Sequence, residues 1–192
     1  ASITGWEYAV YEVWKHQHPS DCLNVPYMIV PPWLAGMGSE IHAYGAALGL
    51  AMSIGRIFIP YPERNDEFSW QFNNSFCQQT SARNLECYYE PWSNCTIYDA
   101  LGSDAENIYK SLYDLAENDS DARLYLSNDV DYGVLDMSSE INKKRLDVMR
   151  DYTNPSITSD MIKKEIINLV DSVQQYKVLY LKGTASLEHG VI

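Results

Sequence analysis

The sequence predicts an α/β fold with a parallel sheet, from the order and spacing of its apolar segments. Two short apolar runs, residues 27–30 and 56–60, flank a helical stretch rich in small residues, and a helix followed by a strand recurs over residues 159–181. A strand, a helix and a parallel strand in this order form one sheet with helices packed on its faces. We expect an N-terminal helical segment over residues 1–25 and an α/β domain over residues 26–192.

Composition and charge narrow the class of function. The chain has 192 residues, 46% of them hydrophobic, and a formal net charge of −12. A chain of this size can bury a core, and its acidic balance argues against a nucleic-acid binder, which needs clustered Lys and Arg. Fifteen Tyr and five Trp are a high aromatic content. Such rings either pack in the core or form surfaces on which sugars stack.

The first expected element is a short amphipathic helix over residues 6–14, closed by Pro19. His16 and His18 follow this helix, and Asp21 is the acidic residue nearest to them in the sequence. Their spacing matches no standard metal site. We therefore expect neither a metal nor another cofactor.

A strand, a helix and a second strand come next. The apolar run 27–30 is bounded by prolines, which cannot donate to a sheet, and predicts a buried strand. A helix is expected over residues 41–54, with Ser39 as its N-cap and Gly55 as its stop. The second strand, residues 56–60, then continues the sheet.

The loop between the first strand and this helix is a candidate ligand-binding loop. Glycines let the backbone approach a ligand closely, and the first N–H groups of a helix are free to bind an anion such as phosphate. The alternative is a strand-to-helix turn without a ligand, because Gly-x-Gly alone is weak evidence. A dinucleotide fingerprint is excluded, since position 41 is Ile where a third glycine belongs. The candidate binding residues are Gly36, Met37, Gly38, Ser39 and His42.

Cysteines and glycosylation sequons indicate an oxidising compartment. The four cysteines lie in the first half of the chain without a Cys-x-x-Cys pair, so they are either free thiols or disulfides, and their even number favours disulfides. Three Asn-x-Ser/Thr sequons point the same way. We expect the protein in the lumen of the Golgi or ER, or outside the cell. The candidates are Cys22, Cys77, Cys87 and Cys95 for disulfides, and Asn73, Asn94 and Asn118 for N-linked glycans.

The sequence contains no evident signal peptide or spanning segment. Its longest apolar run, residues 41–59, includes His42, Ser53, Arg56 and three glycines, whereas a spanning helix needs about 20 mostly apolar residues. We expect contact with a membrane only through an anchor that is not part of this chain.

Two segments of the chain resemble a known family. Residues 36–42 read Gly-Met-Gly-Ser-Glu-Ile-His, and residues 55–60 read Gly-Arg-Ile-Phe-Ile-Pro. With the small-residue helix between them, they resemble the first motif of the GDP-fucose-dependent fucosyltransferases, which include the α-1,6-fucosyltransferases and the protein O-fucosyltransferases. Residues 70–77 and 84–95 are similar to the disulfide-bearing insertion of lumenal relatives.

This resemblance implies a GT-B-like glycosyltransferase with two Rossmann-like halves, inverting and independent of metal, which transfers fucose from GDP-fucose to a glycan or protein hydroxyl. The chain would be the Rossmann-like N-terminal half, with a disulfide-braced insertion at about 62–96. Its glycine loop would bind the donor phosphates or the acceptor through backbone N–H groups, and His42 would lie near the cleft. The implied partners are a sugar nucleotide and a glycan or glycoprotein acceptor.

The chain departs from the family pattern at two points. Glu40 stands where Gln or Asn is usual, and a carboxylate there either acts as a general base or interacts with the helix dipole. We take Glu40 as the candidate catalytic base. The family also has a His-x-Arg element, whose Arg offsets charge on the departing diphosphate. This sequence lacks it, because no Arg stands two residues after any of the four histidines. We therefore expect that the C-terminal donor-binding half is missing and that this piece is inactive alone.

The second half of the chain predicts further helices and strands in alternation. Its clearest helix carries an apolar stripe from Met161 to Val173, with Thr158 among the residues able to cap it. The acidic run 117–121 lacks EF-hand spacing, which favours a solvated loop over a calcium site. The expected elements are helices over 104–116, 138–152 and 159–176, a strand or turn over 124–126, and a strand over 178–181.

Two other functions are compatible with the sequence. A non-catalytic lumenal glycan-binding or interaction protein with the same fold would bind glycans without binding nucleotides. A secreted α/β hydrolase ranks far behind, because the sequence has no Gly-x-Ser-x-Gly nucleophile elbow.

Overall fold

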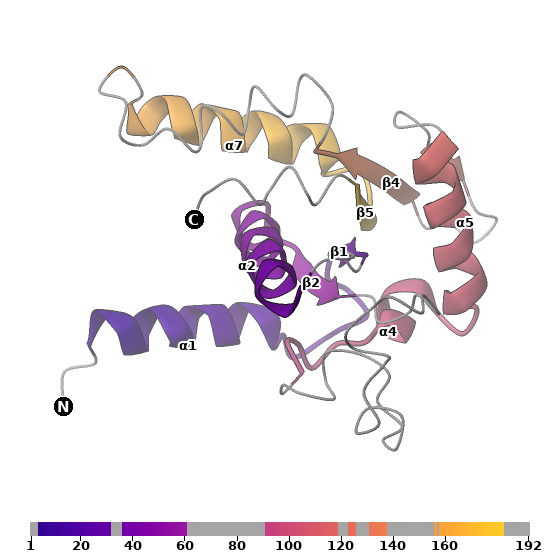
Figure 1. The fold of residues 1–192 in the computed structure, drawn as a ribbon, viewed down its shortest axis with the longest axis horizontal. Helices are drawn as coiled ribbons and strands as arrows, with labels where there is room; N and C mark the ends of the chain where they lie inside the picture. The colour runs from indigo at the N-terminus through magenta and orange to yellow at the C-terminus, as the bar shows by residue number, and fades with distance from the viewer. Residues whose placement is uncertain are drawn as a thin grey trace.

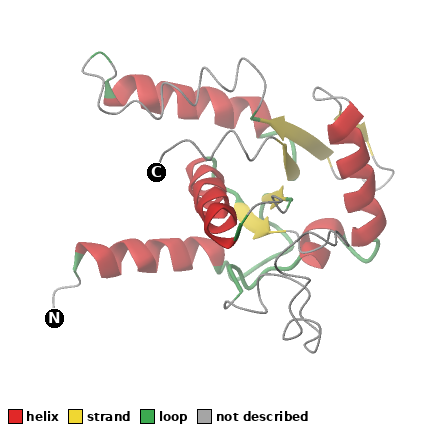
Figure 2. Ribbon diagram, in the orientation of Figure 1, coloured by secondary structure: helices red, strands yellow, loops and turns green. Residues whose placement is uncertain are grey.

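A five-stranded sheet with helices on both faces organises the chain (Figure 1, Figure 2). The computed structural model describes residues 4–31, 36–60, 91–118, 123–125, 131–137, 156 and 158–182. The helices are α1 (Gly5–Gln17), α2 (Met37–Ser53), α4 (Ile97–Leu101), α5 (Ala105–Asn118) and α7 (Ser159–Val173). The strands are β1 (Tyr27–Val30), β2 (Ile57–Pro60), β3 (Arg123–Tyr125), β4 (Asp131–Asp136) and β5 (Val178–Lys182).

The strand order is β2-β1-β5-β4-β3. The first four strands of this order are parallel, and β3 pairs antiparallel with β4 at one edge. The parallel strands β1 and β5 lie inside the sheet and are almost entirely apolar, as expected for strands covered on both faces. The predicted α/β class with a parallel sheet is therefore confirmed.

Alternate residues of each strand face opposite sides of the sheet, and each side has its own core. Val30 of β1 belongs to the cluster that contains α2 and α7. Its neighbour Ile29 belongs to the cluster that contains α4 and α5. The sheet is thus the middle of three layers, with α2 and α7 on one face and α4 and α5 on the other.

Helix α1 begins with a capping box and ends against the edge of the sheet. The Thr4 hydroxyl accepts a hydrogen bond from the Glu7 N–H, and the Glu7 carboxylate accepts one from the Thr4 N–H. At the other end, the buried Gln17 side chain accepts a hydrogen bond of 3.1 Å from the backbone N–H of Phe58 in edge strand β2. The rest of α1 extends away from the sheet (Figure 1).

Helix α2 begins four residues before its predicted start. Gly36 is the N-cap, in an extended conformation, so the prediction that Ser39 caps this helix is wrong. Glycine is itself a favourable N-cap, and Ser39 lies inside the first helical turn. The predicted stop is confirmed, because Gly55 follows the helix with a φ of +69°.

In the second half, two of the three predicted helices and both predicted strands are observed with shifted ends, and two elements were missed. Helix α5, strand β3, helix α7 and strand β5 correspond to predicted segments, and Thr158 caps α7 by accepting a hydrogen bond from Met161 N–H. Helix α4 and strand β4 were not predicted. The helix expected over residues 138–152 lies outside the described residues.

Candidate functional site

The start of α2 lies beyond the carboxyl end of strand β1. Strand β1 ends at Val30, and the helix begins at Met37 after the N-cap Gly36. In open α/β sheets, ligands bind outside the carboxyl ends of the parallel strands. The first N–H groups of a helix, here those of Met37, Gly38 and Ser39, have no acceptor within the helix. This end of α2 therefore offers hydrogen-bond donors at the edge where a ligand is expected.

Among the described residues, none requires a glycine at either of the two glycine positions of this helix start. Neither Gly36 nor Gly38 has a positive φ, and a Cβ added at either would meet no described atom within 4 Å. Both residues are exposed. The described residues therefore leave room beside both glycines, which is the property that a backbone-binding ligand needs.

Glu40 lies one turn into α2 and is almost completely buried, with 1% of its surface exposed. Tyr44, one helical turn further on, is also buried and interacts electrostatically with the Glu40 carboxylate. The pKa of Tyr44 is raised well above its usual range, mainly by burial and then by the negative charge of Glu40. A general base must reach its substrate, and the Glu40 carboxylate is enclosed in this structure, so its catalytic role stays a prediction.

His42 and Glu40 lie on different sides of α2. The His42 side chain is exposed, whereas the neighbouring Ala43 and Tyr44 are buried in the core. The structure therefore brings Glu40 together with Tyr44 and leaves His42 at the surface of the helix that begins the candidate site.

Two charged residues at the same edge of the sheet were missed by the sequence analysis. Asp136 ends β4 and Lys182 ends β5, and they are paired in the register of these parallel strands. The Met137 N–H donates to the Lys182 carbonyl at 2.9 Å, which continues the ladder past the strand end. Asp136 is largely buried, with 8% exposed. A charged residue that closes an apolar run is the signal that would have identified both.

Arg56, part of the segment that resembles the fucosyltransferase motif, lies just before β2, at the amino ends of the parallel strands. This end of the sheet is opposite the one where α2 begins. Its guanidinium is buried and donates hydrogen bonds to four backbone carbonyls, those of Tyr27, Lys177, Val173 and Tyr176. Burial lowers the pKa of Arg56 to about 10, so the side chain is still protonated at neutral pH. Arg56 thus fastens the amino ends of the strands and cannot contact a ligand at the start of α2.

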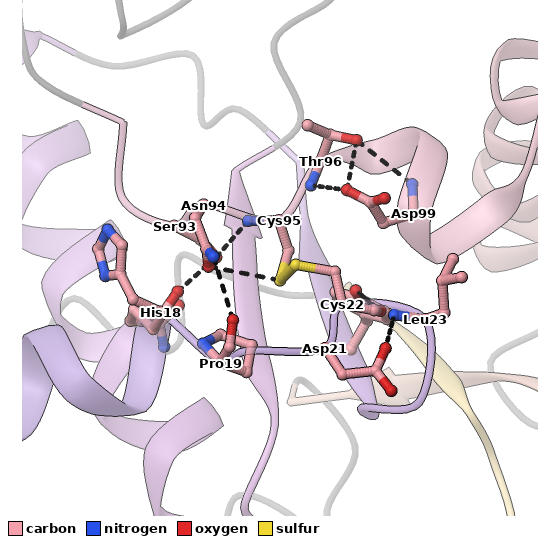
Figure 3. Close-up of a disulfide and its surroundings, with 12 residues drawn as sticks. His18, Pro19, Asp21, Cys22, Leu23, Ser93, Asn94, Cys95, Thr96 and Asp99 are labelled. Carbon is pink, nitrogen blue, oxygen red and sulfur yellow. Dashed lines mark hydrogen bonds between the residues drawn. A yellow bond between two sulfur atoms is a disulfide. The ribbon is translucent and has the colours of Figure 1, made fainter.

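A disulfide joins the segment before β1 to the segment before α4 (Figure 3). Cys22 and Cys95 are 73 residues apart in sequence, and their Cα atoms are 5.5 Å apart. The expectation of a disulfide is confirmed for this pair. Cys77 and Cys87 lie outside the described residues, as does most of the insertion expected over 62–96.

Two of the three candidate glycosylation sites, Asn94 and Asn118, lie within the described residues. Asn94 is exposed, and its side-chain amide donates a hydrogen bond of 3.1 Å to the Pro19 carbonyl (Figure 3). Asn118 is the last residue of α5. Asn73 lies outside the described residues.

Aromatic side chains cover the surface of α1. Trp6 is 76% exposed and Trp14 is 56% exposed, and Tyr8 and Tyr11 are each more than half exposed. The Trp14 ring stacks on the ring of His18, with centroids 4.6 Å apart. These rings are therefore available to bind another molecule instead of packing in the core.

Comparisons with known protein families, with curated proteins and with solved structures find no match. Within the described ranges, no helix is both long and apolar enough to cross a membrane. In the same part of the chain, no three His, Cys, Asp or Glu side chains are grouped as a metal site requires.

Proposed function

We propose that this chain is the Rossmann-like N-terminal half of a GT-B-type, fucosyltransferase-like glycosyltransferase of the secretory pathway. The start of α2 would bind the diphosphate of GDP-fucose, and a glycan or a protein hydroxyl would be the acceptor. The observation that supports this most strongly is the pair of glycines, Gly36 and Gly38, at a helix start beyond β1, where no described residue requires a glycine. Free N–H groups and the helix dipole favour an anion there.

In fucosyl transfer with inversion, the acceptor oxygen forms a bond to C1 of fucose while the bond from C1 to the diphosphate oxygen breaks, and the acceptor proton passes to a base. Glu40 is our candidate for that base. Because its carboxylate is enclosed, this role requires a movement that exposes it. Asp136 is a second carboxylate at the same edge of the sheet. The departing GDP would be held between the start of α2 and the second, donor-binding half of such an enzyme.

Nucleotide binding is the first test. Calorimetric titrations with GDP and GDP-fucose, with GMP and UDP as controls at matched ionic strength, should show selective binding of the guanosine diphosphates. Binding of none of them would contradict the assignment of the α2 start to a donor site and would favour an acceptor-side or non-catalytic role.

Two alanine variants of α2 sharpen this test. The Cβ of a helical residue tilts toward the helix N-terminus, so Gly38→Ala places a methyl group toward the proposed diphosphate. We expect it to weaken GDP binding about tenfold, by about 1.4 kcal/mol. Gly45→Ala is the matched control, because Gly45 is exposed in the same helix and an added Cβ meets no described atom there. Equal affinity in both variants would remove the α2 start from the site.

The role of Glu40 is tested by Glu40→Gln in the protein that carries both halves. If Glu40 is the general base, its removal should lower the catalytic rate about 100-fold or more, while donor binding is retained. Normal turnover in this variant would exclude Glu40 from the reaction and leave it a structural role at the helix start.

The exposed aromatic rings of α1 favour a second candidate, a non-catalytic glycan-binding or interaction protein with the same fold. Flat rings such as Trp6 and Trp14 offer surfaces on which sugar rings stack. This function predicts glycan binding without nucleotide binding. Trp6→Ala should abolish such binding, and Trp6→Phe should retain part of it because a flat ring remains.

A further inference from the structure

The sequon Asn94-Cys95-Thr96 is built into the folded structure by all three of its side chains (Figure 3). The Asn94 amide donates to the Pro19 carbonyl at 3.1 Å. Cys95 is bonded to Cys22. The Thr96 hydroxyl donates to the Asp99 carboxylate at 2.8 Å and accepts from the Asp99 N–H as the N-cap of α4.

N-glycosylation and disulfide formation place opposite demands on this tripeptide. In glycosylation, the Asn94 amide nitrogen forms a bond to C1 of an oligosaccharide carried on a polyprenyl diphosphate. The bond from C1 to the diphosphate oxygen breaks, and the amide nitrogen loses a proton. The sequon must therefore be accessible, with its amide and the hydroxyl two residues later both available to the transferring enzyme.

Closure of the Cys22–Cys95 disulfide removes the accessibility that glycosylation of Asn94 needs. The thiols of Cys22 and Cys95 lose two protons and two electrons to a disulfide-bearing oxidant by thiol–disulfide exchange. Closure then fixes Cys95, the middle residue of the sequon, against the segment before β1, and the sulfur of Cys95 is buried, with 5% of the residue exposed. Cys22 precedes Cys95 by 73 residues, so its thiol is already present when the sequon is synthesised.

We propose that Asn94 is an N-glycan acceptor only until the Cys22–Cys95 disulfide closes, so that the two modifications compete. Asn94 is exposed in the folded chain, so a glycan added first is compatible with later closure. Closure that comes first leaves Asn94 without a glycan. Chains that carry the disulfide are therefore a mixture, glycosylated at Asn94 or not. This inference needs passage through an oxidising compartment and is independent of the proposed transferase function.

The test is the glycan occupancy of Asn94 in the full chain, secreted from eukaryotic cells behind an added signal peptide and measured by mass spectrometry after enzymatic deglycosylation in heavy-oxygen water. Cys22→Ser removes the disulfide and leaves the sequon intact. We expect partial occupancy in the wild type and severalfold higher occupancy in Cys22→Ser. Thr96→Ala should abolish the signal, which assigns it to this sequon. The Asn118 sequon, away from the disulfide, should keep its occupancy in every variant.

Two controls separate the disulfide from general loss of stability. Arg56→Met weakens the fold and keeps both cysteines, and Asp99→Ala frees the Thr96 hydroxyl and keeps the disulfide. Both should leave the occupancy of Asn94 close to the wild-type value. Equal occupancy in the wild type and Cys22→Ser, no glycan at Asn94 in either, or an equal rise in Arg56→Met would each overturn the proposal. Measurement on chains retained inside the cell covers any variant that is not secreted.

Discussion

The Arg56 guanidinium lies 2.7 Å from the carbonyl oxygen of Val173, the last residue of α7, although the two residues are 117 positions apart in sequence. A cation at a helix C-terminus interacts favourably with the helix dipole. The same guanidinium also donates to the carbonyls of Tyr27, Lys177 and Tyr176. One side chain thus joins the end of α7 to the amino ends of three parallel strands.

Arg56→Met should therefore lower the free energy of unfolding by about 3 kcal/mol, because hydrogen bonds from a charged donor each contribute about 1.5–3 kcal/mol but do not add fully. Arg56→Lys should recover only part of this loss, since an ammonium group cannot reach all four carbonyls. Urea unfolding of the three proteins measures both effects. A loss below about 1 kcal/mol for Arg56→Met would show that this contact contributes little.

Gly133, in the middle of β4, lies under the ring of Tyr176. A Cβ added at Gly133 would be 2.7 Å from ring carbons of Tyr176, closer than packed atoms come. Gly133→Ala should cost about 1–3 kcal/mol of stability through this overlap. Combining it with Tyr176→Ala, which removes the ring, should make the added methyl group nearly neutral. Additive losses in the double variant would contradict this account.

His16 should make stability depend on pH in the mildly acidic range. Phe58 N–H donates to the oxygen of the Gln17 amide, which turns the amide nitrogen toward His16 Nδ1 at 3.1 Å and requires a neutral imidazole as acceptor. Burial accordingly lowers the pKa of His16 from its ordinary value of 6.5. The unfolded chain therefore binds more protons than the folded one just below pH 6.5. The contribution of the neutral His16 imidazole to the free energy of unfolding is complete above that pH and is lost as the pH falls.

Urea midpoints at several pH values, for the wild type and His16→Gln, isolate this contribution. The stability of the wild type should fall more steeply with decreasing pH than that of the variant. Parallel curves for the two proteins would show that His16 does not titrate differently in the folded state.

The Cys22–Cys95 disulfide closes a long loop and should contribute strongly to stability. For a separation of 73 residues, the loss of freedom in the unfolded chain corresponds to about 4 kcal/mol. The double variant Cys22→Ala/Cys95→Ala should therefore unfold at a much lower denaturant concentration than the wild type. Cys77 and Cys87 are unchanged in both proteins, so the comparison refers to this bridge alone. A difference below about 1 kcal/mol would mean that the unfolded chain is not constrained by it.

Local signals were sufficient to predict the fold class, and interactions between distant residues were not predictable. Apolar runs bounded by Pro and Gly identified β1, β2 and β5, and the apolar stripe of α7 with its Thr158 cap identified that helix. Strand β4 was missed because Gly133 interrupts its pattern, and the reason for a glycine there, the ring of Tyr176, comes from 43 residues further along the chain.

In the candidate site, too, local features were predictable from the sequence and contacts between distant segments were not. The glycines before α2 were visible in the sequence, and only the position of the N-cap was wrong, because glycine competes with serine for that position. The burial of Glu40 and the register that places Asp136 beside Lys182 depend on how distant segments pack. The partner of Cys22 was equally undetermined, since four cysteines allow three pairings.

The contact between Tyr44 and Glu40 should couple the two side chains energetically. Burial and the charge of Glu40 raise the pKa of Tyr44 well above its usual range, so its hydroxyl stays protonated into alkaline solution. If this hydroxyl donates to an ionised Glu40, Tyr44→Phe removes a hydrogen bond to a charged acceptor, which contributes about 1.5–3 kcal/mol. In a Glu40→Gln background the acceptor is a neutral amide, and the same change should cost about 1 kcal/mol. A double-mutant cycle by urea unfolding gives the coupling directly. Additive effects would mean that Tyr44 does not stabilise the Glu40 carboxylate.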